Sequence, residues 1–499
     1  MSARGAGSAS GALAALALPP LGLWPLAFTA LVPLGVYLAV SLRTRDAAVR
    51  AGLWFAGVHY AVVLHWVPFT LHGMTPFGAL LGLLALAVLT LTGGLLVLVL
   101  HRLLGAGGSP LIAIPAVWVV TEGLLARAGP LAMPWTPLGL ALADSPVLAT
   151  PAEWGGVSVL TLWLGLVNGA LVCCLCRPRG RLGLRFLGVA LLVLGPALFG
   201  GVRTAGLTTE DGAPVWVAAI PMTRAELLEP ERRELAAAES VARISTALRP
   251  RPAAPVTGPV ALLLPEAPFR ASWSEGTEQR IVPLAAEARI PVLAGALVLA
   301  GTAPDSTGQQ LRNGAVLVEP GGRSELVHGK VRLVPGVESN SLAPGPRGGV
   351  LQLGGELVAG VVICFEAAFG RDVRELRRAG ASLLVNPSNE GWFAPVFPLL
   401  GAAARAQHGA HLVLRAVETR MAVLKPSVGG ELLALGPDGG PVRRLRPRDA
   451  IVEEVTPPVS PAMTPYVRFG DLGGLAGLAL LLAAAAPVLL RRTRRRSRA

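Results

Sequence analysis

The sequence predicts a protein in two parts, an α-helical membrane domain of about eight transmembrane helices and an α/β domain. Two observations support this fold class. Apolar segments fill residues 11–201 and return at 472–490, whereas residues 213–460 alternate strand-like and helix-like runs. The 499 residues are also 52% hydrophobic and only 15% charged, although about a quarter of a soluble domain is usually charged.

The first apolar segment, residues 11–42, predicts two short helices rather than one span. It is too long for a single crossing and it is interrupted by prolines, which remove a backbone donor and break helices. Because further apolar segments follow, it resembles a first membrane span more than a cleavable leader. We expect the other spans at residues 52–70, 78–100, 110–127, 155–176, 186–201 and 472–490.

Basic residues between the spans predict the side on which each loop lies. With eight spans, four basic groups fall on one side, which the positive-inside rule makes cytoplasmic. Residues 1–201 would then hold seven helices, 213–460 a catalytic domain on the outer face, 472–490 the last helix and 491–499 a cytoplasmic tail of a multi-pass plasma-membrane protein. The groups are Arg43, Arg45 and Arg50; His101 and Arg102; Arg177, Arg179, Arg181 and Arg185; and Arg491, Arg492, Arg494, Arg495, Arg496 and Arg498.

The net charge of +13 does not indicate nucleic-acid binding. No basic groove motif is present, and much of the excess charge lies in the tail that follows the last apolar segment. A basic tail in that place is typical of a cytoplasmic membrane anchor. We therefore expect the lipid bilayer as a partner and no nucleic acid.

Three of the four cysteines, Cys173, Cys174 and Cys176, lie together in an apolar run. Such a trio could be a lipidation or metal site, but small apolar residues near a helix end are the favoured interpretation. The four cysteines form no disulfide framework. We expect no metal site and no cofactor.

Residues 213–460 predict an α/β domain with a buried sheet, because runs rich in Val, Leu and Ala alternate with amphipathic ones. Helices are expected at about 224–248, 275–289 and 371–379. The expected strands are 215–220, 260–264, 292–299, 315–319, 357–364, 382–385 and 412–415.

Cys364 is the cysteine outside the membrane part, and it ends an apolar strand-like run just before a helical one. A helix N-terminus favours the thiolate, which suits a covalent nucleophile. A buried structural cysteine at a strand end explains Cys364 equally well when the residue is considered alone.

Glu266 and Lys330 also lie at or near strand ends. Glu266 follows a buried strand directly, where a carboxylate could take the proton of a thiol and later return it to a leaving group. Lys330 and Lys425 are the only lysines, against 44 Lys and Arg together. A compact ammonium cannot be replaced by a planar guanidinium at a tight site, so Lys330 could hold the oxyanion of a tetrahedral intermediate. The three residues together suggest acyl chemistry more strongly than any one does.

In order and in flanking sequence, these residues resemble the nitrilase, or carbon–nitrogen hydrolase, superfamily. The membrane part and further motifs resemble its membrane-bound branch, the apolipoprotein N-acyltransferases, over nearly the whole chain. The matching segments are Pro19-Pro-Leu-Gly-Leu-Trp-Pro25, Pro134-Trp135, Ala152-Glu-Trp-Gly-Gly-Val-Ser158, Pro265-Glu-Ala-Pro268, Lys330-Val-Arg-Leu-Val-Pro335, Ile363-Cys-Phe-Glu366, Asn386-Pro-Ser-Asn-Glu-Gly-Trp-Phe393, Arg415-Ala-Val-Glu418 and Thr464-Pro-Tyr-Val-Arg-Phe-Gly-Asp471.

The resemblance implies a four-layer αββα sandwich on an eight-helix membrane base. It implies transfer of a fatty acyl chain from a phospholipid to the N-terminal cysteine amine of a diacylglyceryl lipoprotein, through a thioester. Cys364 would be the nucleophile, Glu266 the general base and Lys330 the oxyanion stabiliser. Among the other residues, Glu338 would orient the site, Glu366 and Trp392 would line it, and Asn313 would be structural.

Four aromatic residues are candidate anchors at the membrane interface: Trp135, Trp154, Trp392 and Phe393. Trp135, Trp392 and Phe393 are also candidate substrate-binding residues. Ordinary core or belt packing is the competing interpretation for each of these side chains.

Two loops depart from the family pattern, Pro221-Met-Thr-Arg-Ala-Glu226 and Ser427-Val-Gly-Gly430. Both would border the substrate cleft, so catalysis is expected to be intact while substrate preference could differ. A membrane-tethered amidase that uses water as acceptor is therefore an alternative, and a catalytically idle scaffold is another. Loss of activity in Cys364→Ala would exclude the scaffold.

Overall fold

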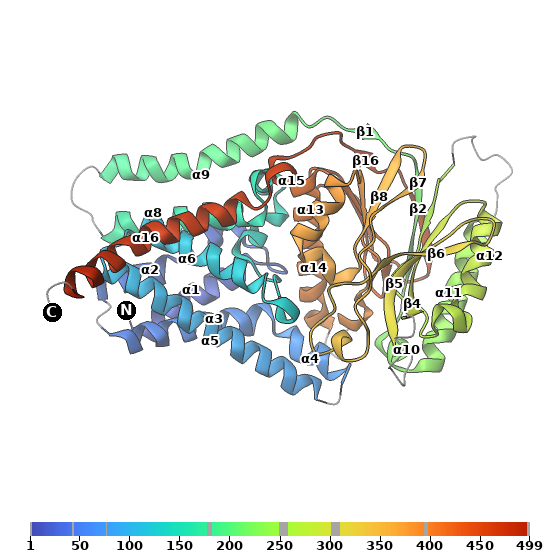
Figure 1. The fold of residues 1–499 in the computed structure, drawn as a ribbon, viewed down its shortest axis with the longest axis horizontal. Coiled ribbons are helices and arrows are strands. Elements are labelled where there is room, and N and C mark those ends of the chain that lie inside the picture. Colours follow the sequence, from blue (N-terminus) through green and yellow to red (C-terminus); the bar gives the residue numbers. More distant parts are fainter. Residues whose placement is uncertain are drawn as a thin grey trace. The chain divides into compact units, whose positions relative to one another are not determined.

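The computed structural model describes residues 2–41, 44–75, 77–176, 182–248, 258–300, 310–393 and 398–496 (Figure 1). It divides into a helical unit, Met1–Pro68 with Ala79–Gly206 and Phe469–Ala499, and a sheet unit, Phe69–Gly78 with Leu207–Arg468. Of the predicted basic groups, Arg43, Arg177, Arg179, Arg181 and Arg498 lie outside the described residues.

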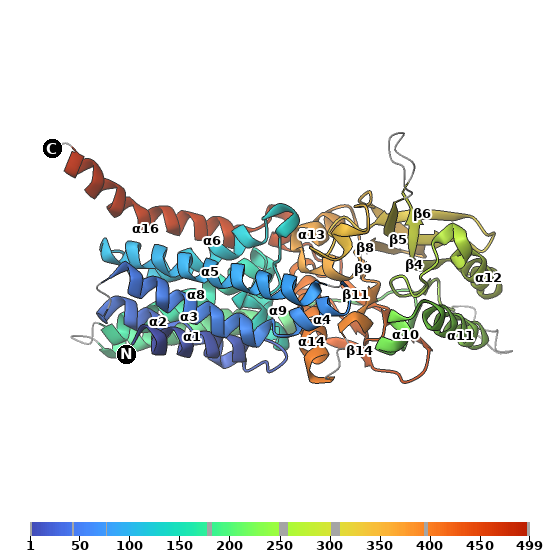
Figure 2. The same ribbon diagram turned by 90° about the horizontal axis from the view of Figure 1, so that it is seen from below.

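The helical unit is built from apolar helices that pack along one another. Helix α1 packs along α3, and α6 packs along both α8 and α16, as Figures 1 and 2 show. The longer helices of this unit are α1 (Ala3–Ala17), α3 (Arg45–Val63), α5 (Gly78–Gly105), α6 (Pro110–Leu125), α8 (Val157–Cys176), α9 (Leu182–Ala205) and α16 (Leu472–Arg496). Short elements join them: η1 (Trp24–Phe28), α2 (Val32–Val36), η2 (Tyr37–Ser41), α4 (Trp66–His72), η3 (Gly129–Leu131), η4 (Leu138–Asp144), α7 (Pro146–Ala149) and η5 (Thr150–Trp154).

Three helices in the described part of the chain are long and apolar enough to cross a membrane: Gly78–Gly105, Val157–Cys176 and Gly183–Ala205. A fourth is added if α3 and α4, which are bent by 55° at their junction, form one span. Trp24–Val40, Pro110–Leu125 and Leu472–Pro487 are apolar but shorter. The apolar segments therefore fold as helices, while the predicted count of eight spans is not confirmed.

Helix α9 shows the surface expected of a membrane helix. Its exposed leucines recur every three or four residues, and each is more than half exposed. A continuous apolar stripe of this kind on an exposed helix is typical of a surface that faces lipid. The leucines are Leu184, Leu187, Leu191, Leu194 and Leu198.

The proline-rich segment near the N-terminus is broken, as predicted. Helix α1 ends at Ala17, eight residues before Pro25, a short 3-10 helix, η1, follows, and α-helical structure resumes with α2 at Val32. The buried Asn168 of α8 satisfies backbone groups in the break, because its amide donates to the Ala27 carbonyl at 2.9 Å and its oxygen accepts from the Leu31 N–H at 2.8 Å. Non-helical backbone at membrane depth requires such partners.

The sheet unit contains two sheets that lie face to face. The first has the order β10-β12-β2-β3-β4-β5-β6, with β15 also paired to β2, and the second has the order β14-β13-β11-β9-β8-β7. The first consists of β10 (Ser388–Asn389), β12 (Ser427–Val428), β2 (Val215–Ile220), β3 (Leu262–Leu263), β4 (Val292–Leu299), β5 (Leu311–Val318), β6 (Ser324–Gly329) and β15 (Ile451–Val455). The second consists of β14 (Pro441–Leu445), β13 (Leu432–Leu435), β11 (Ala422–Lys425), β9 (Leu383–Val385), β8 (Leu357–Val361) and β7 (Val350–Gly354).

Helices cover both outer faces of the sheet pair, which gives the four-layer αββα arrangement (Figures 1 and 2). Helices α11 and α12 lie on the first sheet, and α13 and α14 lie on the second. These helices and the short elements beside them are α10 (Arg224–Leu228), α11 (Pro230–Leu248), η6 (Trp273–Thr277), α12 (Glu278–Ala288), η7 (Glu338–Asn340), η8 (Cys364–Ala368), α13 (Gly370–Arg378), η9 (Glu390–Phe393), α14 (Pro398–Thr419) and α15 (Pro465–Phe469). A small pair, β1 (Glu210–Asp211) with β16 (Pro458–Val459), stands apart from both sheets.

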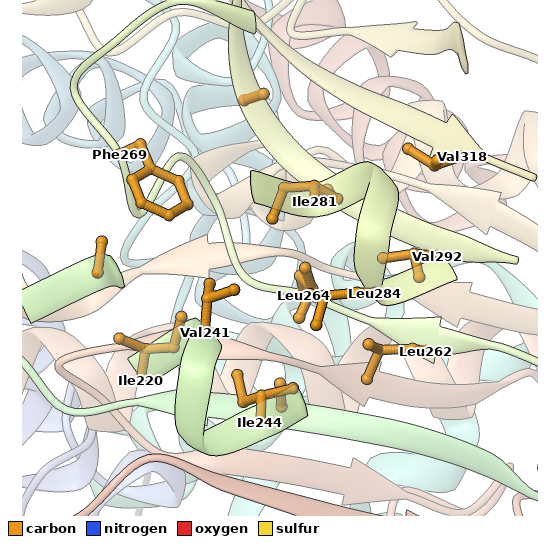
Figure 3. Close-up of a cluster of buried hydrophobic side chains, with 14 of the residues drawn as sticks. Ile220, Val241, Ile244, Leu262, Leu264, Phe269, Ile281, Leu284, Val292 and Val318 are labelled. Atoms are coloured by element: carbon orange, nitrogen blue, oxygen red, sulfur yellow. The ribbon is translucent and has the colours of Figure 1, made fainter. Parts of the chain in front are cut away.

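Strand alternation divides the core into two layers. In β2, Val215 and Val217 point into the layer between the sheets, whereas Ala218 and Ile220 point toward the helices. Figure 3 shows the layer between the first sheet and its helices, where Val241 and Ile244 of α11 pack against sheet residues. Side chains on successive residues of a strand face opposite ways, so a strand buried on both faces is apolar throughout.

Most predicted strands are present, but the strand predicted at residues 412–415 is wrong. These residues lie inside α14, and Leu412 and Leu414 are fully buried. Because α14 is buried on most of its surface, its apolar run shows no clear period, and a short run of this kind cannot be told from a buried strand. The strand predicted at 357–364 ends earlier, at Val361, so Cys364 opens the turn η8.

Candidate active site

Glu266 and Lys330 form a buried ion pair beside a third charged group, Glu338. Glu266 follows β3 through Pro265, and Lys330 directly follows β6. Lys330 Nζ donates to Glu266 Oε1 at 2.9 Å and to Glu338 Oε1 at 2.7 Å. Burial lowers the pKa of Lys330, but the two carboxylates outweigh burial and hold that pKa well above its usual value. The side chain is therefore an ammonium bridging two carboxylates.

Two asparagines fix the orientation of Glu266. The Asn313 side chain donates to Glu266 Oε1 at 2.6 Å and also to Glu338 Oε1 at 3.3 Å. The backbone N–H of Asn389 donates to Glu266 Oε2 at 2.7 Å. Together with Lys330, these donors hold the Glu266 carboxylate in one orientation.

Cys364 occupies a strained backbone position at the start of η8. Its φ of 48° is in the left-handed region, which is uncommon for a residue other than glycine. Its N–H donates to the Pro387 carbonyl at 3.0 Å, and its side chain is buried. Backbone strain of this kind persists only where surrounding contacts enforce it, and it is often found at active sites.

The surroundings of Cys364 favour the neutral thiol over the thiolate that the sequence suggested, because they raise its pKa. Burial raises the pKa of Cys364 well above its usual value, the nearby carboxylate of Glu266 raises it further, and Lys330 offsets this only in part. The turn that Cys364 begins spans only five residues, so its dipole cannot overcome these effects. Such a thiol can act as a nucleophile only together with a base that takes its proton.

Glu366 joins the segment after Lys330 to the segment before Cys364. Its carboxylate accepts from the backbone N–H of Val331 at 2.8 Å, of Arg332 at 3.1 Å and of Ile363 at 2.8 Å. The ring of His328 lies 2.8 Å from the same carboxylate. Burial raises the pKa of Glu366, but His328 and the backbone donors outweigh burial and lower it overall.

The aromatic candidates lie in both units. Trp392 and Phe393 are half-buried in η9, directly after Glu390. The Arg233 guanidinium lies 5.8 Å from the centre of the Trp392 ring. Trp135 lies in the helical unit, where it is buried with its ring 5.9 Å from that of Trp66.

Sequence reasoning missed Arg233, which holds the loop after Glu266. Its guanidinium donates to the carbonyls of Ala267, Pro268 and Phe269. It also missed the buried group of Glu390, His408 and Lys425 behind Cys364. Arg233 carries no signal among so many arginines, but Lys425 was marked by being one of two lysines.

The two loops that depart from the family pattern, residues 221–226 and 427–430, lie close together in the structure. Strand β12 pairs in parallel with the end of β2, and the Gly429 N–H donates to the Ile220 carbonyl at 2.8 Å. A Cβ at Gly429 would lie 2.6 Å from the Gly391 Cα, so this loop contacts η9 closely. The departing residues are therefore neighbours of the turn that carries Trp392.

This arrangement provides a thiol, a fixed carboxylate and an ammonium within one buried group. Such a set can form and break an acyl–sulfur bond, with the carboxylate moving the proton and the ammonium facing the developing oxyanion. No cluster of three or more His, Cys, Asp or Glu side chains suited to a metal ion occurs in the residues that the structure describes.

The chain matches two family models in sequence. Residues 10–170 match the apolipoprotein N-acyltransferase N-terminal domain, and residues 256–439 match the carbon–nitrogen hydrolase domain. In solved structures, an amidase from Nesterenkonia sp. is similar, with a TM-score of 0.35 and 18% identity over 50% of this chain and 93% of that one. The site and the hydrolase match define a carbon–nitrogen hydrolase domain, here joined to an apolar helical domain.

Curated relatives extend this similarity over nearly the full length. An apolipoprotein N-acyltransferase of Geobacter metallireducens is 28% identical, with 95% of this chain and 94% of the relative covered. One of Azotobacter vinelandii is 29% identical, with 95% and 92% covered. The chain belongs to the apolipoprotein N-acyltransferase family.

Proposed function

We propose that the chain transfers a fatty acyl group from a membrane phospholipid to the N-terminal cysteine amine of a diacylglyceryl lipoprotein. The observation that supports this most directly is the grouping of Glu266, Lys330 and Cys364 at one buried site. The family membership supports the acyl donor and acceptor.

In the first half-reaction, Glu266 takes the proton of Cys364 as the sulfur attacks the ester carbonyl of the phospholipid. Lys330 stabilises the negative charge that forms on the carbonyl oxygen. The tetrahedral intermediate then breaks its C–O bond, Glu266 returns the proton to the departing alkoxide, and a lysophospholipid leaves. Cys364 is left as a thioester.

In the second half-reaction, the uncharged amine of the lipoprotein attacks the thioester carbonyl. Glu266 removes a proton from the attacking nitrogen, and Lys330 again faces the oxyanion. The C–S bond breaks, the sulfur recovers its proton from Glu266, and an amide is formed. Glu266 ends each half-reaction as the carboxylate that began it, so one residue serves as the base in both.

The other site residues act on this group indirectly. Glu338 shares Lys330 and Asn313 with Glu266, so it keeps the ammonium in place. Glu366 holds together the two segments that carry Lys330 and Cys364. We assign Trp392, Phe393 and Trp135 to contacts with the substrate.

We also propose the topology that the charge pattern suggests. Seven helices within residues 1–201 and one at 472–490 cross the plasma membrane, the catalytic domain at 213–460 lies on the outer face, and the tail at 491–499 is cytoplasmic. The run of exposed leucines on α9 supports contact with lipid. An acyl chain then stays in the bilayer throughout the reaction.

The test is incubation of the purified full-length protein with labelled phospholipid and a diacylated lipopeptide, followed by mass spectrometry. We expect a triacylated lipopeptide, and an acyl adduct on the Cys364 peptide when the acceptor is withheld. Cys364→Ala should give neither. Release of free fatty acid alone, or ammonia from amide substrates, would favour the amidase alternative.

A further inference from the structure

A second buried charged group lies directly behind Cys364, and the mechanism above does not use it. It consists of Glu390 at the start of η9, His408 in α14 and Lys425 at the end of β11. Lys425 Nζ donates to Glu390 Oε1 at 2.6 Å, and His408 Nδ1 lies 2.8 Å from the same oxygen. On its other side, His408 Nε2 lies 3.2 Å from the backbone carbonyl oxygen of Cys364. All three side chains are at most 1% exposed.

The two neighbours of His408 determine the orientation of its ring. Burial raises the pKa of Glu390, but Lys425 and His408 outweigh burial and hold it well below its usual value, so this carboxylate is ionised. An ionised carboxylate and a carbonyl both only accept hydrogen bonds. The ring of His408 therefore lies between two hydrogen-bond acceptors, the Glu390 carboxylate and the Cys364 carbonyl, which fix its orientation.

The carbonyl that His408 contacts belongs to the peptide plane between Cys364 and Phe365. It also accepts from the Asn386 side chain at 3.3 Å. Because a trans peptide is planar, two donors on the carbonyl also fix the opposite direction of the Phe365 N–H. The positive φ of Cys364 needs contacts of this kind to hold it.

We propose that His408, oriented by the Glu390 carboxylate that Lys425 also contacts, is a positioning residue that fixes the Cys364–Phe365 peptide and so aims the thiol at the acyl carbonyl. The assignment rests on the proposed function, in which Cys364 is the nucleophile. His408 acts through the backbone of Cys364 and does not touch the substrate.

Two substitutions of His408 separate positioning from mere packing. Glutamine can place its amide nitrogen near the former Nε2 and still donate to the Cys364 carbonyl. Asparagine reaches only the former Nδ1 and loses that donor. For acylation of Cys364 by phospholipid, we expect kcat to fall about a hundredfold in His408→Asn and about tenfold in His408→Gln, with KM nearly unchanged. Equal losses in the two variants would overturn the proposal.

A second comparison removes the charge of Glu390 alone and then the charges of Glu390 and Lys425 together. Glu390→Gln alone leaves Lys425 buried without its carboxylate, so this variant should lose thermal stability. Glu390→Gln combined with Lys425→Met removes both charges and should recover the melting temperature. Its kcat should stay at least tenfold low, because His408 has lost the carboxylate that orients it. Recovery of both quantities would show a purely structural role.

The control is His411→Gln, a buried histidine of the same helix that the proposal does not use. It should keep kcat within about twofold of the unaltered protein. Alkylation of Cys364 by iodoacetamide provides a readout that needs no acyl donor or acceptor, and His408→Asn should react at least tenfold more slowly than His411→Gln. If the unaltered protein makes no triacylated product, the proposed function fails. If the two histidine variants react with iodoacetamide equally fast, the positioning role fails.

Discussion

At the scale of single residues, burial and the charges around Cys364 determine how readily its thiol ionises. Glu266 and Glu338 bring two negative charges and Lys330 one positive charge, so the group is net negative before the thiol ionises. Burial disfavours a thiolate at Cys364 most strongly, and the negative group adds to this effect. The surroundings therefore favour a protonated sulfur, which is why the proposed mechanism assigns removal of that proton to Glu266.

Glu266→Gln should separate sulfur reactivity from turnover. Because the pKa of Cys364 is raised, its alkylation by iodoacetamide should keep accelerating at pH values above the ordinary thiol pKa of about 8.5. Removing the carboxylate lowers this pKa, so the profile should move to lower pH and alkylation near pH 7 should become faster. Acyl transfer should fall by about 10²–10⁴-fold, because the base is lost. A profile that does not move would contradict the charge balance.

Lys330→Arg tests the requirement for an ammonium. Arginine keeps the charge, but its planar guanidinium cannot reproduce two short contacts from one nitrogen to Glu266 and Glu338. We expect kcat for acyl transfer to fall about a hundredfold or more, the cost of losing one oxyanion donor. Near-normal turnover in Lys330→Arg would remove its oxyanion role.

Sequence alone could predict those residues of the site whose local sequence is distinctive. Glu266, Lys330 and Cys364 each stand beside an apolar strand, and Lys330 is rare by composition. Arg233 and His408 could not be found this way, because their contacts join residues 34 and 44 positions apart and depend on the packing of α11 and α14. The raised thiol pKa was also out of reach, since burial is a property of the folded chain.

At the scale of elements, β4 makes room for Glu266. A Cβ at Gly295 would lie 2.5 Å from the Glu266 Cα and 2.5 Å from the Pro265 carbonyl oxygen. Real Cβ atoms do not approach backbone so closely, so the absence of a side chain lets the loop after β3 lie against β4. The strand thus sets the position of Glu266 without contributing a polar side chain at this point.

Gly295→Ala should therefore damage the site more than the fold. The added methyl must displace the Glu266 backbone, and we expect kcat for acyl transfer to fall by at least about tenfold. Gly321→Ala is the matched control, because nothing lies within 4 Å of its added Cβ. Circular dichroism melting should show both variants folded. A Gly295→Ala protein with full activity would show that the loop can shift freely.

Patterns predicted long elements better than short ones. The strands at 215–220 and 292–299 were placed at their observed ends, because both are continuous apolar runs between breaks. Strands β6, β13 and β14 were missed, since they are short or polar and depend on neighbours for pairing. The buried helix α14 was misread in part for the same reason, because its surroundings and not its period determine its form.

At the scale of the whole molecule, composition predicted a helical domain and an α/β domain, and the structure has both. Composition could not give the number of membrane crossings. Helices such as α1 and α6, of 15 and 16 residues, fall below the length of about 20 residues that a span requires. Apolar composition alone does not separate a short span from a helix buried among others.

Accessibility of single cysteines would test the proposed topology. In a chain whose four native cysteines are replaced by serine, Arg323→Cys should react with a membrane-impermeant maleimide in intact spheroplasts. Asp46→Cys should react only after lysis, since it lies in the first basic loop. Both positions are exposed, so labelling reports the side of the membrane. Labelling of Asp46→Cys from outside would contradict the eight-span parity.

The raised pKa of Cys364 has a consequence for the timing of the reaction. A thioester sulfur is as uncharged as a thiol, so surroundings that penalise a thiolate do not penalise the acylated state. Release of the acyl group requires the sulfur to leave, and because leaving as a bare anion is disfavoured there, it needs the proton that Glu266 takes from the incoming nucleophile in the proposed mechanism. Until a nucleophile reaches Glu266, the loaded protein should therefore be long-lived, storing its acyl group between the departure of one lipid and the arrival of the next.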